Sequence, residues 1–257
     1  VVSERNSLVS LSGSKRARIL RTLMSWCYPM ADLVVSVSRD GASELVSDLG
    51  LQSDRVTAIP NPVPLEDIKD CSALPPDHRW LSPGGPPVVL AVGRLEAQKD
   101  YSTLLQAFAL LRREHDLRLI ILGEGSLRSQ LASQIRELGL DNSVELLGFV
   151  SNPFAWMGAC DLYVMSSLYE GFPNSLVQAL ACGAKIVSTN CRTGPSEILE
   201  NGTWGSLVPV GDIDALAQAM LAALIDPAKP EGVRRAAFFS IDQITDEYLQ
   251  VLLTEQN

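Results

Sequence analysis

The sequence predicts an α/β protein built on a doubly wound parallel sheet. Two observations carry this prediction. Short apolar, β-branched runs alternate with helical patterns along most of the 257 residues, which is typical of βαβ units. Five successive predicted strands are followed by loops that contain glycine or charged residues, and such loops gather at one edge of a parallel sheet. We therefore expect a ligand site along that edge.

The composition indicates a globular protein with a well-buried core, since 46% of the residues are hydrophobic and 20% are charged. The net charge of −9 argues against a general nucleic-acid binder. No apolar run approaches the roughly 18 residues of a membrane span, and no secretory signal is recognisable. The five cysteines form no CxxC pair, which speaks against a disulfide framework or a zinc site and favours a reducing cytoplasm.

A proline-rich stretch divides the chain. Residues 60–87 hold eight of the 15 prolines, a composition typical of a linker or a crossing between domains. The expected segments are a partial first domain at 1–63, a linker at 64–87, a second domain at 88–230 and a helical tail at 231–257. The chain begins with Val1 rather than Met, so we expect it to be a fragment.

The first segment predicts a piece of a sheet, in which helical patterns at 15–30 and 38–49 alternate with strands at 33–37 and 56–59. After the linker the pattern restarts and predicts six parallel strands with helices on both faces. The expected strands are 88–92, 117–122, 144–147, 162–165, 186–188 and 206–210. The expected helices are 99–115, 126–138, 153–157, 173–182, 194–199 and 212–224, followed in the tail by 232–239 and 242–253.

The amino-terminal residues are basic although the whole chain is acidic. Residues 1–24 carry a net charge of +4, which leaves −13 for the remainder. Apolar side chains, including Ile19, Leu23 and Trp26, are interleaved with these charges. A solvated helix face is the favoured interpretation, and an amphipathic helix in peripheral contact with an anionic membrane is the alternative.

The most informative stretch is 169–183, where a loop carrying Glu170 turns into a short helix. Pro173 suits the first helical position, and Gly183 supplies a left-handed stop. The free amides between Gly171 and Ser175 therefore lie at a helix start, which is a place that attracts phosphate.

Other strand ends offer further ligand-binding groups. Arg94 and Lys99 follow the strand at 88–92, where two cations can clamp a diphosphate. The turn at 123–125 contains two glycines, which permit a close approach of backbone to ligand. Main-chain groups at 148–151 can border a nucleobase, and residues 193–197 form another loop-to-helix start. Each of these loops is weak evidence by itself, because an ordinary surface loop explains it equally well. Their occurrence after successive strands of one sheet favours a nucleotide site.

These motifs together resemble the nucleotide-sugar half of the retaining GT-B glycosyltransferases of family four, the glycosyl transferases group 1. The resemblance covers the chain from about Val88 to its end, and residues 31–63 look like the end of the acceptor-side domain with the crossover. It rests on Gly93-Arg94-Leu95 with Lys99, Gly123-Glu124-Gly125, Gly148-Phe149, Glu170-Gly171-Phe172-Pro173-Asn174, Ala181-Cys182-Gly183 and Gly194-Pro195-Ser196-Glu197.

The resemblance implies a role for each matching residue. Arg94 and Lys99 would bind the donor diphosphate and stabilise the leaving group, and Glu170 would accept hydrogen bonds from the donor sugar. These three are the expected catalytic residues, and neither a metal nor a cofactor is expected. The expected donor-binding residues are Gly93, Gly123, Glu124, Gly148, Phe149, Val150, Gly171, Phe172, Pro173, Asn174, Ser175 and Gln178.

Gln178 departs from the family pattern, which usually has a second glutamate eight positions after the first. A carboxylate accepts from both ribose hydroxyls with charge assistance, whereas an amide accepts at one end and donates at the other. We expect weaker or re-oriented ribose binding.

The resulting expectation is a glycosyltransferase that moves a hexosyl or N-acetylhexosaminyl group from a UDP- or GDP-linked donor to a glycan or lipid-linked acceptor, with retention of configuration. Bacterial surface polysaccharide synthesis on the cytoplasmic membrane face fits the basic amino-terminal segment. The fragment is expected to bind nucleotide and to transfer little by itself. The alternatives are a noncatalytic nucleotide-sugar-binding module and a sugar-nucleotide epimerase or phosphorylase of the same architecture.

Overall fold

A computed structural model describes residues 1–8, 15–74, 76–228 and 231–254. Several predicted features therefore lie outside the described residues. They are residues 9–14 and the side chains of 15–17 in the basic segment, Pro75 of the linker, the boundary at 229–230 and the last three residues of the tail.

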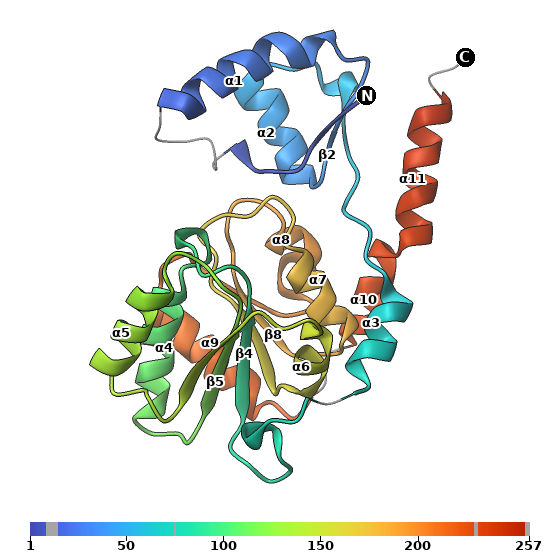
Figure 1. Ribbon diagram of the computed structural model, residues 1–257. Helices are drawn as coiled ribbons and strands as arrows, with labels where there is room; N and C mark the ends of the chain where they lie inside the picture. The colour runs from blue at the N-terminus through green and yellow to red at the C-terminus, as the bar shows by residue number, and fades with distance from the viewer. Residues whose placement is uncertain (9–14, 75, 229–230, 255–257) are drawn as a thin grey trace.

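The amino-terminal unit is a small parallel sheet in the order β1-β2-β3 with two helices (Figure 1). Its elements are β1 (Val2–Glu4), α1 (Lys15–Cys27), β2 (Val34–Ser36), α2 (Arg39–Leu49) and β3 (Val56–Ala58). The sequence predicted the last two strands but not β1, because Val2 is followed by the polar and charged residues Ser3, Glu4 and Arg5 and not by an apolar run. Tertiary pairing with β2 makes this segment a strand.

The second unit contains the predicted six parallel strands, in the order β6-β5-β4-β7-β8-β9. They are β4 (Val88–Val92), β5 (Arg118–Leu122), β6 (Val144–Gly148), β7 (Leu162–Met165), β8 (Ile186–Thr189) and β9 (Ser206–Val208). The strand order reverses between β4 and β7, which makes this the topological switch point of a doubly wound sheet. The predicted fold class is confirmed.

Helices cover both faces of this sheet, because successive strand residues point to opposite sides. The helices are α4 (Tyr101–Arg112), α5 (Arg128–Glu137), α6 (Pro153–Ala159), α7 (Asn174–Ala181), α8 (Pro195–Ile198), α9 (Ile213–Ile225) and α10 (Gly232–Ala236). Val89 and Ala91 pack with α4, α5 and α9, whereas Val88 and Leu90 pack with α6 and α7. Short 3₁₀ turns lie at 28–30, 53–55, 79–81, 97–99, 200–202 and 237–239.

The stretch expected as a linker contains a helix, α3 (Leu65–Ser72). Glu66 and Asp67 in its first turn complement the helix dipole. Ile68 is fully buried in the core between α6 and α7. The chain therefore crosses to the second unit before α3, and Val63 and Ile68 hold the start of the proline-rich stretch in the core of that unit.

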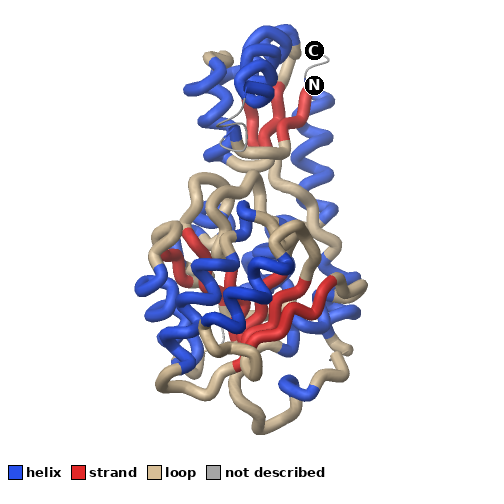
Figure 2. Tube along the Cα trace, turned by 60° about the vertical axis from the view of Figure 1, so that its left-hand side comes forward, coloured by secondary structure: helices blue, strands red, loops and turns tan. Residues whose placement is uncertain are grey.

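The carboxy-terminal helix α11 (Ile241–Thr254) returns to the amino-terminal unit, beside which it runs in Figure 2. Ile244 is buried in a cluster with Leu33, Val35 and Ile59 of the small sheet. A parallel bridge between Val63 and Ser240 joins the outgoing and returning segments. Two chain crossings therefore connect the units, and they lie side by side.

Candidate functional site

The switch point of the six-stranded sheet brings Lys99 and Glu170 together. Lys99 lies in the loop after β4 and Glu170 in the loop after β7, and β4 and β7 are neighbours. The Lys99 Nζ lies 2.6 Å from Glu170 Oε1, with 15% and 9% of the two side chains exposed. The structure thus unites two of the three predicted catalytic residues in a mostly buried ion pair.

Gln98 holds the Glu170 loop from the β4 side. Its Nε2 donates to the main-chain oxygen of Tyr169 at 2.9 Å and to Glu170 Oε2 at 3.2 Å. The main-chain carbonyl of Gln98 accepts a hydrogen bond from the amide of Leu168 at 2.8 Å. The side chain and backbone of one residue therefore fix three consecutive positions of the loop that ends in the carboxylate.

Hydroxyl groups fix Glu170 from within its own loop and from the loop after β8. Ser167 Oγ donates to Glu170 Oε1 at 2.7 Å. Thr193, which is fully buried, donates its hydroxyl to the Glu170 main-chain oxygen. Thr189 Oγ1 donates to the Ser167 carbonyl at 2.7 Å. Three neighbouring strand ends thus position one carboxylate.

Sequence reasoning missed Gln98 and Ser167, and it included Thr193 only as the first residue of the loop-to-helix start at 193–197. Gln98 was overlooked because it lies between two more conspicuous charged residues, Arg94 and Lys99. Ser167 and Thr193 had a usable signal, since they are small polar residues that follow the carboxyl ends of apolar strands.

Glycines allow the neighbouring loops to pack backbone to backbone. A Cβ at Gly123 would lie 2.0 Å from the carbonyl oxygen of Gly93, and a Cβ at Gly93 would lie 2.9 Å from Lys99 Cε. Gly148 has a φ of +84°, and its Cβ would lie 2.6 Å from Glu124 Oε1. Gly123 therefore permits contact with the Gly93 backbone, while Gly93 and Gly148 make room for the Lys99 and Glu124 side chains.

The remaining predicted residues of the β4, β5 and β6 loops are open to solvent. Arg94 and Glu124 are exposed, and Glu124 forms an ion pair with Arg128 at 2.9 Å. Phe149 is 82% exposed. Val150 packs partly against the core. Arg94 and Phe149 are therefore accessible to a ligand lying over these loops.

The start of α7 differs slightly from the prediction. Pro173 is the residue before the helix, with a ψ of 89°, so Asn174 and not Pro173 takes the first helical position. The predicted left-handed stop at Gly183 is confirmed by its φ of 73°. Phe172 is buried edge-to-face with Phe239, which supports the loop from beneath.

The polar residues of α7 face the other unit or lie half-buried. The Asn174 Oδ1 accepts from Asn61 Nδ2 at 3.0 Å, which joins the helix start to the amino-terminal crossing. Ser175 and Gln178 are half-buried.

Burial disfavours the ionised form of the Cys191 thiol, which lies near Glu170. Burial, with a further contribution from the nearby Glu170, raises the pKa of Cys191 to about 12. A thiol with so high a pKa is a poor nucleophile near neutral pH. In the part of the chain that the structure describes, no three or more His, Cys, Asp or Glu side chains are grouped as a metal site.

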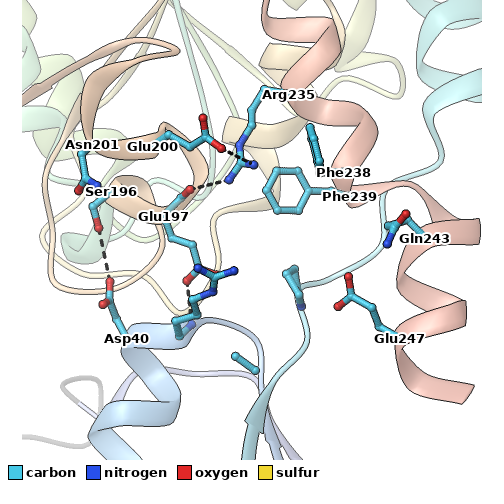
Figure 3. Close-up of a pocket in the computed structure, with 13 residues that line it drawn as sticks. Asp40, Ser196, Glu197, Glu200, Asn201, Arg235, Phe238, Phe239, Gln243 and Glu247 are labelled. Carbon is cyan, nitrogen blue, oxygen red and sulfur yellow. Dashed lines mark hydrogen bonds and ion pairs between the residues drawn. The ribbon is translucent and has the colours of Figure 1, made fainter. Parts of the chain in front are cut away.

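A second polar region lies between the units on the side of the crossings (Figure 3). A pocket of about 440 Å³ is lined by residues of α2, α8 and α11, and Glu170, Lys99 and Arg94 are not among its lining residues. Arg235 reaches Glu200 at 2.9 Å, and the Arg39 amide donates to Glu197 Oε2 at 2.7 Å. We refer to it below as the hinge-side pocket.

Comparison with known families gives two matches in chain order. The family described as Glycosyl transferases group 1 matches residues 77–238, and the one described as Glycosyltransferase Family 4 matches residues 4–67.

Curated relatives that the chain resembles are named as sugar transferases. An N-acetylgalactosamine-N,N'-diacetylbacillosaminyl-diphospho-undecaprenol 4-alpha-N-acetylgalactosaminyltransferase of Campylobacter jejuni is 30% identical over 96% of this chain and 67% of its own length. A lipopolysaccharide 1,6-galactosyltransferase of Salmonella typhimurium is 29% identical over 73% of this chain and 51% of its own length. The chain thus spans between half and two thirds of these relatives.

Solved structures share the fold. The crystal structure of Anabaena Alr3699/HepE in complex with UDP and glucose has a TM-score of 0.83 at 23% identity, covering 98% of this chain and 71% of that one. Sucrose-phosphate synthase from Thermosynechococcus elongatus has a TM-score of 0.81 at 22% identity, covering 96% and 65%.

Proposed function

We propose that this chain, which belongs to the glycosyl transferases group 1 family, binds the diphosphate of a nucleotide sugar at the loops after β4 and β7, as the donor-binding part of a glycosyltransferase. The observation that carries the proposal is the Lys99–Glu170 pair at the switch point, where ligands of doubly wound sheets bind. The exposed Arg94 lies on the same loop as Lys99.

The two cations have different tasks because their surroundings differ. Arg94 is exposed and available to a diphosphate that arrives from solvent, whereas Lys99 is already paired with Glu170. The diphosphate of a nucleotide sugar carries two negative charges and a carboxylate carries one, so a bound diphosphate competes for the Lys99 ammonium. Both cations then stabilise the negative charge that develops on the departing nucleotide.

Glu170 retains capacity for a sugar hydroxyl. Its Oε1 accepts from Lys99 and Ser167, while its Oε2 accepts, among the described residues, from Gln98 alone. A carboxylate offers about four acceptor positions, so Oε2 can accept one more hydrogen bond from the donor sugar. The surrounding donors keep this carboxylate in place before the sugar arrives.

The reaction we propose is transfer of a hexosyl or N-acetylhexosaminyl group from a UDP- or GDP-linked donor to a glycan or lipid-linked acceptor, with retention of configuration and without a metal or cofactor. The names of the Campylobacter and Salmonella relatives, which mention a diphospho-undecaprenol compound and lipopolysaccharide, support a role in bacterial surface glycan assembly. We place this role at the cytoplasmic side of the membrane as part of the proposal.

Peripheral membrane contact belongs to the same proposal. Ile19, Leu23 and Trp26 of α1 are 63%, 55% and 77% exposed, and the exposed Arg18 lies on the same helix. Such a surface suits the interface of an anionic bilayer. Within the described residues no helix is long and apolar enough to cross a membrane.

Calorimetry with UDP and GDP tests the donor site. We expect Arg94→Ala to weaken binding of the preferred nucleoside diphosphate about tenfold, since a charge-assisted hydrogen bond contributes about 1.5–3 kcal/mol. Arg113→Ala removes the same charge from an exposed position beside the end of α4 and should leave binding unchanged. Equal effects of the two variants, or no binding by the unmodified chain, would contradict the proposal.

A labelled nucleotide sugar separates the rival activities. Incorporation of label into a glycan or lipid fraction by the full-length protein supports transfer. An isomerised sugar nucleotide would indicate an epimerase, a sugar 1-phosphate would indicate a phosphorylase, and binding without turnover a noncatalytic module.

A further inference from the structure

The loop that follows β1 lies directly on the Glu170 loop. A Cβ at Gly171 would lie 2.5 Å from the carbonyl oxygen of Arg5 and 3.1 Å from the Cα of Asn6. Only a residue without a side chain permits this approach, and Gly171 immediately follows Glu170. Residues 5–8, which we call the cover loop, therefore pack against the residue that follows the proposed sugar-binding carboxylate.

Glu44 of α2 holds the cover loop. Its Oε2 accepts from the amide of Leu8 and from the hydroxyl of Ser7, each at 3.0 Å. Glu44 is 3% exposed. Among the described residues, Glu44 and Glu170 are the two carboxylates that the fold buries. Carboxylates are seldom buried unless they are paired, so this second buried carboxylate requires a cation.

The cation comes from the other unit. Arg192, in the loop after β8, places its Nε 2.8 Å from Glu44 Oε1. The next residue, Thr193, is fully buried and donates its hydroxyl to the main chain of Glu170. The cover loop is thus connected through Glu44, Arg192 and Thr193 to the proposed sugar-binding carboxylate.

A second ion pair between the units has a different character. Arg39 and Glu197 approach only to 3.9 Å and 87% of the Arg39 side chain is exposed, against 2.8 Å and 55% for Arg192 in its pair with Glu44. Solvent screens such a pair, so its loss changes little. Loss of Arg192 instead leaves Glu44 as a buried carboxylate without its countercharge, which favours water entry and displacement of the cover loop.

We propose that Glu44 and Arg192 are positioning residues that keep the cover loop over the sugar end of the donor pocket, so that separation of the two units opens the sugar subsite while leaving the diphosphate subsite formed. This inference rests on the proposed nucleotide-sugar site. Arg94 and Lys99, which we propose to bind the diphosphate, both belong to the second unit. The sugar end of the site, in contrast, is formed by both units.

The inference is tested by comparing the binding of a sugar nucleotide with the binding of its nucleoside diphosphate. Calorimetry of the full chain uses UDP, GDP, UDP-glucose, UDP-N-acetylgalactosamine and GDP-mannose. For the tightest sugar nucleotide, we expect Arg192→Gln to raise the Kd about fivefold while the Kd of its nucleoside diphosphate stays within about twofold. Arg192→Lys should restore part of the loss, and the control Arg39→Gln should leave both constants within about twofold. An equal change for both ligands, or no change for either, would overturn the inference.

Hydrogen exchange provides a readout that does not depend on a ligand. We expect Arg192→Gln to speed exchange in the peptide that ends at Leu8 by about tenfold, with Arg39→Gln unchanged. If the unmodified chain bound none of the nucleotides, the proposed function would fall, and accelerated exchange would still establish the connection between the units. Unchanged exchange in Arg192→Gln would overturn the connection itself.

Discussion

The Glu170 site and the hinge-side pocket both lie where the two units face each other, and both contain carboxylates and cations. Glu170 is buried and accepts hydrogen bonds from Lys99, Gln98 and Ser167. In the hinge-side pocket, the Arg39 side chain is 87% exposed and the Glu200 side chain 48% exposed. The Glu197 and Arg235 side chains are 15% and 11% exposed, so each hinge-side ion pair has one exposed member, whereas both members of the Lys99–Glu170 pair are mostly buried.

This difference indicates which charged residues are prepared for chemistry. A group held by several donors from different strands keeps its position when a substrate arrives, so little free energy is spent on ordering it. An exposed ion pair contributes only about 0–1 kcal/mol and is screened by salt. Burial and fixed partners, more than residue type, distinguish the candidate site.

The largest expected effect comes from breaking the buried pair. Lys99→Met leaves Glu170 buried without its cation and should lower the free energy of unfolding by about 3 kcal/mol in urea denaturation. Arg39→Met, at the hinge-side pocket, should lower it by less than about 0.5 kcal/mol. Similar losses from both variants would remove the distinction between the two regions.

The second-largest expected effect comes from a steric clash between the β4 and β5 loops. Gly123→Ala places a Cβ 2.0 Å from the Gly93 carbonyl oxygen and should cost about 2 kcal/mol in unfolding free energy. The control is Gly202→Ala beside the hinge-side pocket, where φ is also positive but nothing lies within 4 Å. Its cost should be about 1 kcal/mol, from backbone strain alone. A Gly123→Ala variant as stable as the control would show that the two loops can separate freely.

Gln178→Glu addresses the position at which the chain departs from the family pattern. A carboxylate there should tighten nucleoside-diphosphate binding about fivefold, since charge-assisted hydrogen bonds are stronger than neutral ones by about 1 kcal/mol. Calorimetry together with a thermal melt checks affinity and folding separately. Unchanged or weaker affinity in a folded variant would argue against a ribose-binding role for this position.

The smallest expected effect is a pH dependence in the hinge-side pocket. Burial raises the pKa of Glu197 above its ordinary value, so the folded state holds this proton more tightly than the unfolded state does. Ionised Glu197 therefore lowers stability above the raised pKa, and this penalty disappears below about pH 4, where both states are protonated. Glu197→Gln should raise the melting temperature slightly at pH 7 and leave it unchanged at pH 3.5. A pH-independent difference would contradict the assignment.

The sequence by itself determined the six strands of the larger sheet and the loops at its edge. Apolar runs such as 88–92 and 117–122 are long enough to be recognised, and the glycine after α7 acts through local backbone conformation. The family assignment rested on motifs in chain order, and the matches at 77–238 and 4–67 confirm it.

Only the tertiary structure decided which side chains meet. Strand β1 is defined by its pairing with β2. The helix at 242–253 was predicted, but its place beside the small sheet is decided by the apolar cluster that it completes with Leu33 and Ile59. The contacts of Gln98 with Glu170 and of Arg192 with Glu44 join residues 72 and 148 positions apart. Local propensity and periodicity act over a few residues, whereas such distant contacts depend on the strand order and on how the two units pack, which no short window of sequence contains.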